Sequence, residues 1–187
     1  MTAAGYGRDM GRAVTLAGAA LMAACAEPEP APTVEVPCGS AGVQARPPFT
    51  AVAPGCTRFL GALHAPDPDA GVLAPLATLR HVDGGVSVFR NHGLAEFRPL
   101  GRLETVGGPL SIRFDDGLLT GLAGLEQVRE VGGLELAYLP ALRSLAGLDR
   151  LEIVRGDVTV TDLPALPRRE IDDLLARVRV EGQIVVE

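Results

Sequence analysis

The sequence predicts an α/β repeat solenoid of about six 24-residue coils with a short parallel sheet. Three observations predict this fold class. A frame of the form apolar-x-Gly-x-apolar-x-apolar recurs along the chain. The segments between the frames place apolar residues at every third position. Finally, 23 glycines and 15 prolines among 187 residues favour many turns over long helices.

The recurring frame has a regular spacing. It is present in "FLGALHA", "VDGGVSV", "VGGPLSI", "VGGLEL", "VRGDVTV" and "VEGQIVV", the fourth with one residue deleted. Steps of 23, 24, 24, 24 and 26 residues separate the first apolar residues after the glycine, which are Leu63, Val86, Leu110, Leu134, Val158 and Ile184. Such a period is typical of one leucine-rich-repeat-like coil. We expect each apolar triplet to be a strand, entered through a glycine corner where the chain turns tightly or takes positive φ.

Apolar residues between the frames recur at a constant step of three. One such series is Leu122, Leu125, Val128 and Val131, and a second is Leu142, Leu145, Leu148, Leu151 and Val154. An α-helical face alternates steps of three and four. A constant step of three instead predicts a chain that turns corners with an apolar residue pointing inward at each.

One longer helix is expected near the C-terminal end of the repeats. In "PRREIDDLLARV", residues 167–178, Ile171, Leu174, Leu175 and Val178 follow the i, i+3, i+4, i+7 spacing of an amphipathic helix. Pro167 suits a first helical position. We expect this helix to cap the repeats and to replace the loop of the last coil before the final strand.

Residues 1–25 are predicted to be a lipoprotein-type signal peptide. Arg8 and Arg12 precede the apolar run "AVTLAGAALMAA", which is too short to span a bilayer as a permanent helix. The run ends in "LMAAC", which resembles the lipobox of bacterial lipoproteins. This resemblance implies that Cys25 is lipidated and becomes the mature N-terminus. The alternatives are a cleaved signal in which Cys25 has no role, and a buried apolar helix.

A tether and a pair of cysteines follow the signal peptide. Residues 26–37, "AEPEPAPTVEVP", are predicted to be an extended Pro/Glu-rich tether that holds the domain at 38–187 off a membrane surface. The chain has three cysteines, so lipidation of Cys25 leaves Cys38 and Cys56, which an oxidising compartment would join. Closing that loop would stabilise the fold by roughly 3 kcal/mol. Two free thiols are the alternative.

The stretch "CTRFLGALHA" carries a family resemblance. Cys56, Thr57, Phe59, Gly61 and Leu63 fit a pattern in which a disulfide-bonded cysteine precedes small-x-apolar-x-Gly-x-Leu. Together with "GLAGLEQV" and "SLAGLDRL", this stretch resembles the receptor L domain, a leucine-rich-repeat-like right-handed β-helix of insulin-receptor and epidermal-growth-factor-receptor ectodomains, with related repeats in bacterial lipoproteins. The resemblance covers residues 38–187 and implies a disulfide N-terminal cap.

Two features depart from the family pattern. "PPFTAVAPG" between the cysteines contains three prolines, so the capping helix of the family is expected to be short or missing. The asparagine that follows the strand in the family occurs only as Asn91. No continuous asparagine ladder is expected, because its counterparts are Asp115, Leu139 and Leu163.

The sequence contains no strong catalytic signal. It lacks the GxSxG, HExxH, GxGxxG and Walker motifs. Because "VGGPLSI" is one of several regularly spaced copies of the frame, its two glycines are interpreted as structural rather than as a phosphate-binding loop. His64, His81 and His92 fall in three coils, which favours isolated histidines over a metal site. We therefore expect no enzyme, no metal and no cofactor.

Two further motifs have structural interpretations. Asp115 and Asp116 follow a strand, and a solvated turn is favoured over a cation site. The "RGD" at 155–157 is interpreted as the corner before a strand rather than an adhesion motif. A formal charge of −6 argues against nucleic-acid binding, and 4% aromatic residues without tryptophan provide few stacking platforms.

The outward side of the predicted sheet is the candidate ligand-binding surface. By resemblance to receptor L domains, whose sheet face or its edge contacts peptide ligands, the candidate residues are His64, Ser87, Phe89, Ser111, Arg113, Glu135, Thr159 and Thr161. The expected function is that of a monomeric lipoprotein, anchored in the bacterial cell envelope at the outer membrane or cell surface, that binds a protein, peptide or glycan. The alternatives are a structural envelope lipoprotein without a specific ligand and, less favoured, a carbohydrate-active β-helix enzyme.

Overall fold

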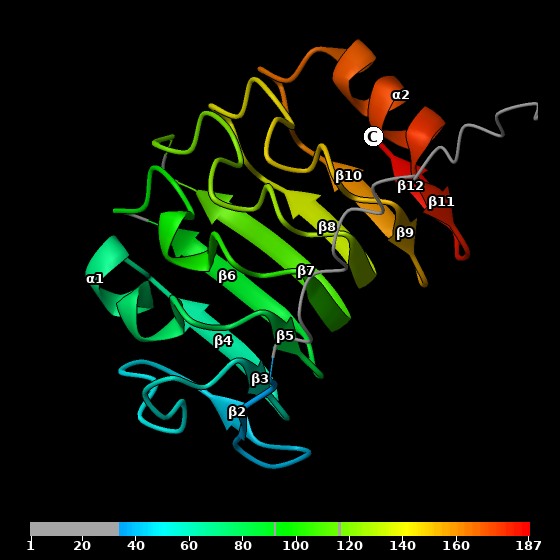
Figure 1. The fold of residues 1–187 in the computed structure, drawn as a ribbon. Coiled ribbons are helices and arrows are strands. Elements are labelled where there is room, and N and C mark those ends of the chain that lie inside the picture. The colour runs from blue at the N-terminus through cyan, green and yellow to red at the C-terminus, as the bar shows by residue number, and fades with distance from the viewer. Residues whose placement is uncertain (1–33, 92, 116) are drawn as a thin grey trace, which may run out of the picture. The chain divides into compact units, whose positions relative to one another are not determined.

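Two ladders of parallel strands run through the protein and share β7 (Thr105–Asp115) and β8 (Glu130–Ala137) (Figure 1). The first ladder also contains β1 (Pro37–Cys38), β3 (Arg58–Phe59), β5 (His81–Val82), β9 (Ile153–Val154) and β11 (Arg179–Val180). The second also contains β2 (Gln44–Ala45), β4 (Ala62–Pro66), β6 (Val86–Asn91), β10 (Val158–Thr161) and β12 (Ile184–Val186). The protein is therefore mostly β, with a long parallel sheet of short strands.

This computed structural model describes residues 34–91, 93–115 and 117–187. The predicted signal peptide at 1–25, the lipidation site Cys25 and the tether as far as Thr33 lie outside the described residues, as do His92 and Asp116. Val34–Glu187 forms a compact unit, and all that follows concerns it.

The strand predicted after each glycine frame is confirmed in the second ladder. Strand pairing joins the first apolar residues of successive frames in the order Leu63, Val86, Leu110, Leu134, Val158 and Ile184. The register shifts between Val106 and Pro109, which matches the residue missing from "VGGLEL". The first ladder was not predicted. Neither was the rung β2, whose Ala45 pairs with Leu63.

The glycines of the frame mark the bend between the two ladders. A Cβ on Gly132 would come 2.2 Å from the Gly107 carbonyl oxygen, and one on Gly108 would come 2.6 Å from the Gly85 nitrogen. Neither glycine has positive φ. The predicted glycine corner is therefore confirmed, but glycine is needed there for a reason other than a left-handed backbone. Backbones of neighbouring coils approach too closely for a side chain.

Residues at the constant step of three form turns whose apolar side chains point into one core. The Leu125 N–H donates to the Leu122 carbonyl over 3.2 Å, and the Val128 N–H to the Leu125 carbonyl over 3.0 Å. Leu148 and Leu151 repeat the same pattern one coil later. All of these residues are at most 2% exposed. Burying each such side chain contributes about 1.5–3 kcal/mol relative to leaving it exposed.

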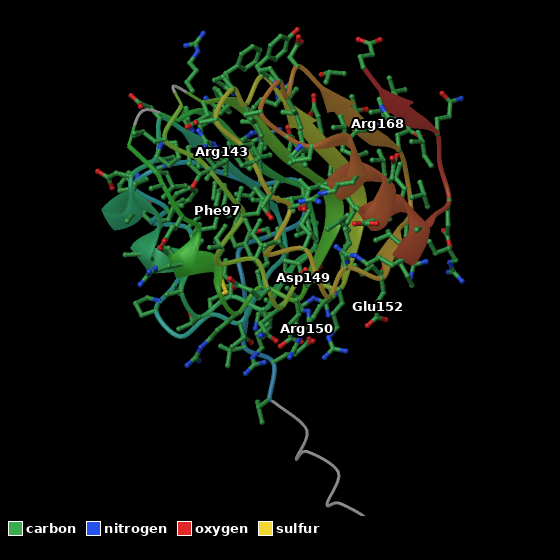
Figure 2. The ribbon with its side chains drawn as sticks, turned by 90° about the horizontal axis from the view of Figure 1, so that it is seen from above. Phe97, Arg143, Asp149, Arg150, Glu152 and Arg168 are labelled. Atoms are coloured by element: carbon green, nitrogen blue, oxygen red, sulfur yellow. A yellow bond between two sulfur atoms is a disulfide. The ribbon has the colours of Figure 1, made fainter. Side chains whose placement is uncertain are left out.

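Two short α-helices and two 3₁₀ segments connect the strands. These are α1 (Ala70–Leu73), η1 (Ala74–Leu76), η2 (Arg98–Leu100) and α2 (Arg168–Arg177). The predicted C-terminal helix is confirmed as α2, with Pro167 one position earlier, at the N-cap. Its Arg177 donates from Nη1 to the carbonyls of Leu148 (2.8 Å) and Asp149 (3.1 Å). Arg177 therefore lies beside Asp149, Arg150 and Glu152, which are labelled in Figure 2.

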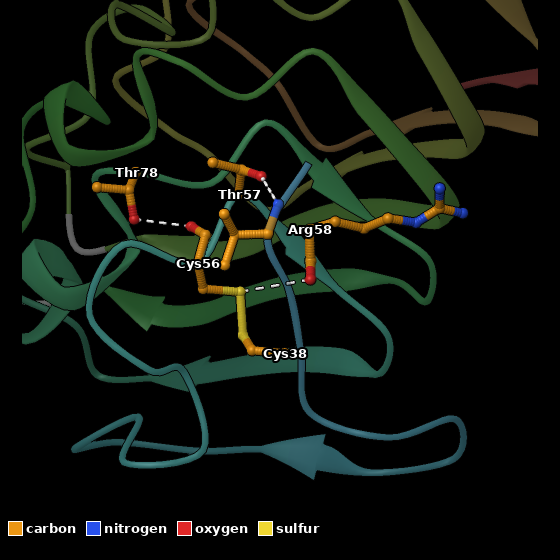
Figure 3. Close-up of a disulfide and its surroundings, with 6 residues drawn as sticks. Cys38, Cys56, Thr57, Arg58 and Thr78 are labelled. Carbon is orange, nitrogen blue, oxygen red and sulfur yellow. Dashed lines mark hydrogen bonds between the residues drawn. A yellow bond between two sulfur atoms is a disulfide. The ribbon is translucent and has the colours of Figure 1, made fainter. Parts of the chain in front are cut away.

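A disulfide closes the N-terminal part of the unit. Cys38 in β1 is bonded to Cys56, with the two Cα atoms 5.8 Å apart. Thr78 donates from Oγ1 to the Cys56 carbonyl over 2.7 Å, and Thr57 Oγ1 accepts from the Val36 N–H over 2.8 Å (Figure 3). The segment between the two cysteines contains β2 and turns but no helix, as its prolines predicted.

The last coil leaves part of its apolar interior exposed. Ile184 pairs with Val158, an inward position that is 1% exposed, but Ile184 itself is 50% exposed. Among the described residues, no further strand pairs with the open edge of β12. The helix α2 buries Ile171 and Leu174, and Val186 of β12 packs against the core, while Ile184 stays half exposed. The expected C-terminal helix is therefore present, but it leaves part of the last coil exposed to solvent.

Candidate functional site

Strand register brings the first row of predicted residues side by side. His64 pairs with Ser87, Ser87 with Ser111, Ser111 with Glu135, and Glu135 with Thr159, so the five lie on successive strands of the second ladder. Their neighbours along each strand are buried residues such as Leu110 and Ile112. Because strand side chains alternate between faces, these five residues share the face opposite the core.

The second row of predicted residues is interrupted. Phe89 pairs with Arg113, but the next position is Ala137, which separates Arg113 from Thr161 by one strand. The row therefore places Phe89 and Arg113 together and leaves Thr161 apart from them.

A hydrogen-bonded group of three side chains occupies the centre of this face. Ser111 donates from Oγ to Glu135 Oε2 over 2.7 Å, and Arg113 donates from Nη1 to Glu135 Oε1 over 3.4 Å. Ser111 is only 5% exposed. The Nε of Arg113 is buried without a hydrogen-bond partner in the part of the chain that the structure describes. Unpartnered buried N–H groups are uncommon in native proteins. Because this atom is shielded from solvent, a ligand would reach it only after the Arg113 side chain moved.

A groove of about 290 Å³ runs over this group. Its lining includes five of the predicted residues, namely His64, Ser87, Ser111, Arg113 and Glu135. Phe89, Thr159 and Thr161 do not line it. We call this the sheet groove. It combines hydroxyl groups, one carboxylate and one guanidinium with the apolar walls of Val86 and Pro109.

The ion pair in the sheet groove is only partly shielded from solvent. The side chains of Arg113 and Glu135 are 38% and 34% exposed. Pairs at this level of exposure contribute little to stability, about 0–1 kcal/mol. Arg113 and Glu135 can therefore exchange their mutual contact for contacts with a ligand at small cost to the fold.

The outward side of the first ladder carries a separate network of charges. Arg58 bonds Asp83 Oδ1 over 2.9 Å and Glu35 Oε2 over 3.1 Å. The hydrogen bond to Asp83, followed by that to Glu35, raises the pKa of Arg58. The pKa of Arg155 is raised in the same way by Glu130. Arginine is charged throughout the physiological range in any case, and these solvent-exposed pairs link neighbouring coils with the small stabilisation typical of surface ion pairs.

The other candidates in the sequence prove to be structural. Asp115 is 6% exposed, and its Oδ2 accepts from the N–H groups of Gly117 (2.8 Å) and Leu119 (2.9 Å), so the predicted solvated turn is wrong at this residue. In "RGD", Arg155 bonds Glu130 and Asp157 accepts from the Gln183 N–H over 2.8 Å, at the predicted corner between β9 and β10.

Two of the three histidines that were considered as metal ligands lie in different ladders. Within the described ranges, no group of three or more metal-ligating side chains could hold an ion. His81 bonds Thr105 through Nδ1 over 2.8 Å, in the first ladder, whereas His64 lies in the second. His92 lies outside the described residues.

Sequence reasoning missed a pair of aromatic residues at the end of the second ladder. Phe114 and Tyr138 are 47% and 48% exposed, and their rings stack with centroids 4.6 Å apart. They lie one period apart, immediately after the outward positions Arg113 and Ala137. The spacing of one period between the two aromatic residues was the signal in the sequence that could have identified them. Extending the candidate rows by one position would have found them.

No helix among the residues that the structure describes has the length and apolar character needed to cross a membrane. Searches of family models, curated proteins and solved structures found no match to this chain.

Proposed function

We propose that this protein is a lipid-anchored, extracytoplasmic envelope protein that binds a protein, peptide or glycan ligand in the sheet groove without catalysis. The observation that carries the proposal is the groove itself. It gathers five residues from four different coils around the hydrogen-bonded group of Ser111, Arg113 and Glu135. A rigid sheet presents such groups in fixed positions, which lowers the entropy lost on binding.

The fold supports a relationship to leucine-rich-repeat-like right-handed β-helices of the receptor L domain type. In support, the strands repeat at about 24 residues, and the Cys38–Cys56 disulfide precedes "RFLGALHA". The missing helix between the cysteines and the leucines at positions 139 and 163 remain departures from that pattern.

The polar groups of the sheet groove support binding rather than catalysis. Acid–base chemistry on a glycan uses two carboxyl groups that flank the scissile bond. Glu135 is the one acidic side chain in the described lining of the groove, and Ser111 and Arg113 both bond it. Its oxygens are therefore suited to holding a donor.

The anchor is proposed from the sequence. "LMAAC" at 21–25 and the Pro/Glu-rich stretch after it support lipidation of Cys25 and a tethered domain. Mass spectrometry of the mature protein tests this directly. We expect an N-terminus at Cys25 that carries a diacylglyceryl thioether. An unmodified N-terminus upstream of Cys25 would exclude the lipoprotein.

Ligand capture by groove variants tests the binding function. We expect the combined variant Arg113→Ala, Glu135→Ala to capture about tenfold less envelope or secreted partner than the wild type, because the central polar contacts are lost. Arg143→Ala combined with Asp173→Ala is the matched control. Both residues are exposed and lie outside the second ladder, and the pair leaves the net charge equal to that of the groove variant. Undiminished capture by the groove variant would exclude the sheet face as the binding surface, whereas the absence of any partner captured by the wild type would favour the structural envelope protein.

A further inference from the structure

The second ladder ends in a row of residues with left-handed backbone. Asp67, Arg90, Phe114, Tyr138 and Asp162 have φ of 53°, 55°, 58°, 57° and 53°, and they follow one another at one residue per coil. Glycine and asparagine adopt this conformation readily, whereas bulky side chains rarely do. The corner itself needs no ring. The presence of phenylalanine and tyrosine at two adjacent corners therefore points to a use for the rings.

The two rings are held in place and remain open to solvent. Phe114 and Tyr138 stack at 4.6 Å between centroids with 6° between their planes, and about half of each side chain is exposed. The Tyr138 N–H donates to the Thr161 carbonyl and its own carbonyl accepts from the Asp115 N–H, both over 3.2 Å. These bonds tie the corner to the coils on both sides. The rings consequently form a fixed, exposed apolar ridge.

A groove of about 470 Å³ lies along this ridge. Its walls include Phe114, Tyr138, Pro140 and Pro164, with Arg90 and Asp162 on the coils that flank the two rings. We call it the ridge groove. Among these lining residues, none belongs to the sheet groove.

We propose that the ridge groove binds an extended proline-rich peptide segment in the polyproline II conformation, with a basic residue placed at Asp162. Polyproline II segments dock on aromatic-lined grooves. Their carbonyls have no internal hydrogen bonds, so they can accept from the Tyr138 hydroxyl. The opposite charges of Arg90 and Asp162 would set the direction of the peptide.

The dimensions of the ladder fit this ligand. Parallel strands are about 4.8 Å apart, so two coils advance about 9.6 Å. One polyproline II turn of three residues advances about 9.3 Å. Prolines at every third position would therefore meet equivalent places on alternate coils. From Arg90 to Asp162 the row spans three strand spacings, about 14 Å, which accommodates four or five residues of such a segment.

A glycan fits the ridge groove less well. Sugar rings stack on open aromatic faces and need several polar partners, whereas Phe114 and Tyr138 cover one face of each other. Asp115, which also lines the groove, is engaged by the N–H groups of Gly117 and Leu119. The apolar walls and the two terminal charges favour the peptide.

Fluorescence anisotropy with a labelled proline-rich peptide tests the proposal. The probe has prolines at every third position and one terminal arginine, and a glycine–serine peptide with the same arginine is its control. We expect the full chain to bind the proline-rich probe saturably and not to bind the glycine–serine peptide. Phe114→Gly combined with Tyr138→Gly should weaken binding of the proline-rich probe by about tenfold. Asp162→Asn should also weaken it, because the charge contact with the terminal arginine is lost.

The glycine substitutions also separate binding from folding. Glycine suits the left-handed corner, so the double variant should keep or raise Tm while it loses the probe. Arg113→Ala with Glu135→Ala, in the sheet groove, should bind the probe as the wild type does. The proposal is overturned if the wild type does not bind the probe or if the glycine variant binds it equally well. It is likewise overturned if oligosaccharides bind at the ridge and the peptide does not.

Discussion

At the scale of single residues, the frame glycines allow neighbouring coils to approach closely because they have no side chain. The frame glycines lie where one coil crosses the carbonyls of the previous coil, and a Cβ at position 132 would lie only 2.2 Å from the Gly107 oxygen. The sequence predicted this column because glycine recurs at a fixed offset from the apolar triplet. It could not predict the left-handed corners at Phe114 and Tyr138, since bulky residues are poor signals of positive φ.

Gly132→Ala should lower the free energy of unfolding by about 3 kcal/mol, because the added methyl group meets backbone that cannot move without shifting a whole coil. Gly121→Ala is the matched control. Its added Cβ would have its nearest neighbour at 3.9 Å, so we expect a change within about 1 kcal/mol. Urea denaturation measures both. Equal midpoints for the two variants would contradict close approach as the reason for glycine at position 132.

At the scale of elements, the strands of the second ladder were predictable and those of the first were not. Leu110, Ser111 and Ile112 alternate apolar and polar residues, which indicates a strand with one buried face. The first ladder consists largely of two-residue strands such as Ile153–Val154, which are too short to show alternation. Asp115 was misread for a related reason. Its burial depends on the backbone N–H groups of the following turn, which sequence spacing does not reveal.

The disulfide should be the strongest single tie of the N-terminal coil. Removing it with Cys38→Ser and Cys56→Ser should lower the free energy of unfolding by about 3 kcal/mol, since an 18-residue separation is then left open in the unfolded chain. Denaturation with and without a reducing agent measures this. The reductant should destabilise the wild type and leave the double variant unchanged. An effect of the same size on both would show that the loss has another cause.

At the scale of the whole molecule, each coil is stabilised by its neighbours in the stack. The central strands β7 and β8 have paired strands on both sides. Within the described part of the chain, β12 pairs with β10 alone and leaves Ile184 and Val185 exposed at 50% and 40%. Stability in a stack of repeats depends on such nearest-neighbour contacts. Local stability should therefore fall from the centre of the stack towards β12.

Hydrogen exchange measured by mass spectrometry checks this gradient. Amides of β7 and β8 should exchange slowest and those of β12 fastest, because opening the last coil disrupts one interface instead of two. Reduction of the disulfide should accelerate exchange near β1 and β3 first. A uniform rate across all strands would mean that the stack opens as one unit.

Much of the candidate site was also readable from the sequence, for a reason at this scale. A constant period carries His64, Ser87, Ser111 and Glu135 to adjacent strands, so their meeting follows from spacing alone. The spacing did not predict which of these residues line the sheet groove. Thr159 and Thr161 share the face and yet lie outside the lining, because the period gives the face of each side chain and not the place where the packed side chains leave a depression.

Carbodiimide labelling of carboxylates, with and without the captured ligand, locates binding most directly. Glu135 lies in the sheet groove with 34% of its side chain exposed, and Glu152 lies in the first-ladder region with 65% exposed and serves as the internal reference. Binding in the sheet groove predicts that the ligand protects Glu135 and leaves the labelling of Glu152 unchanged. Equal labelling of Glu135 in the free and bound protein would contradict it.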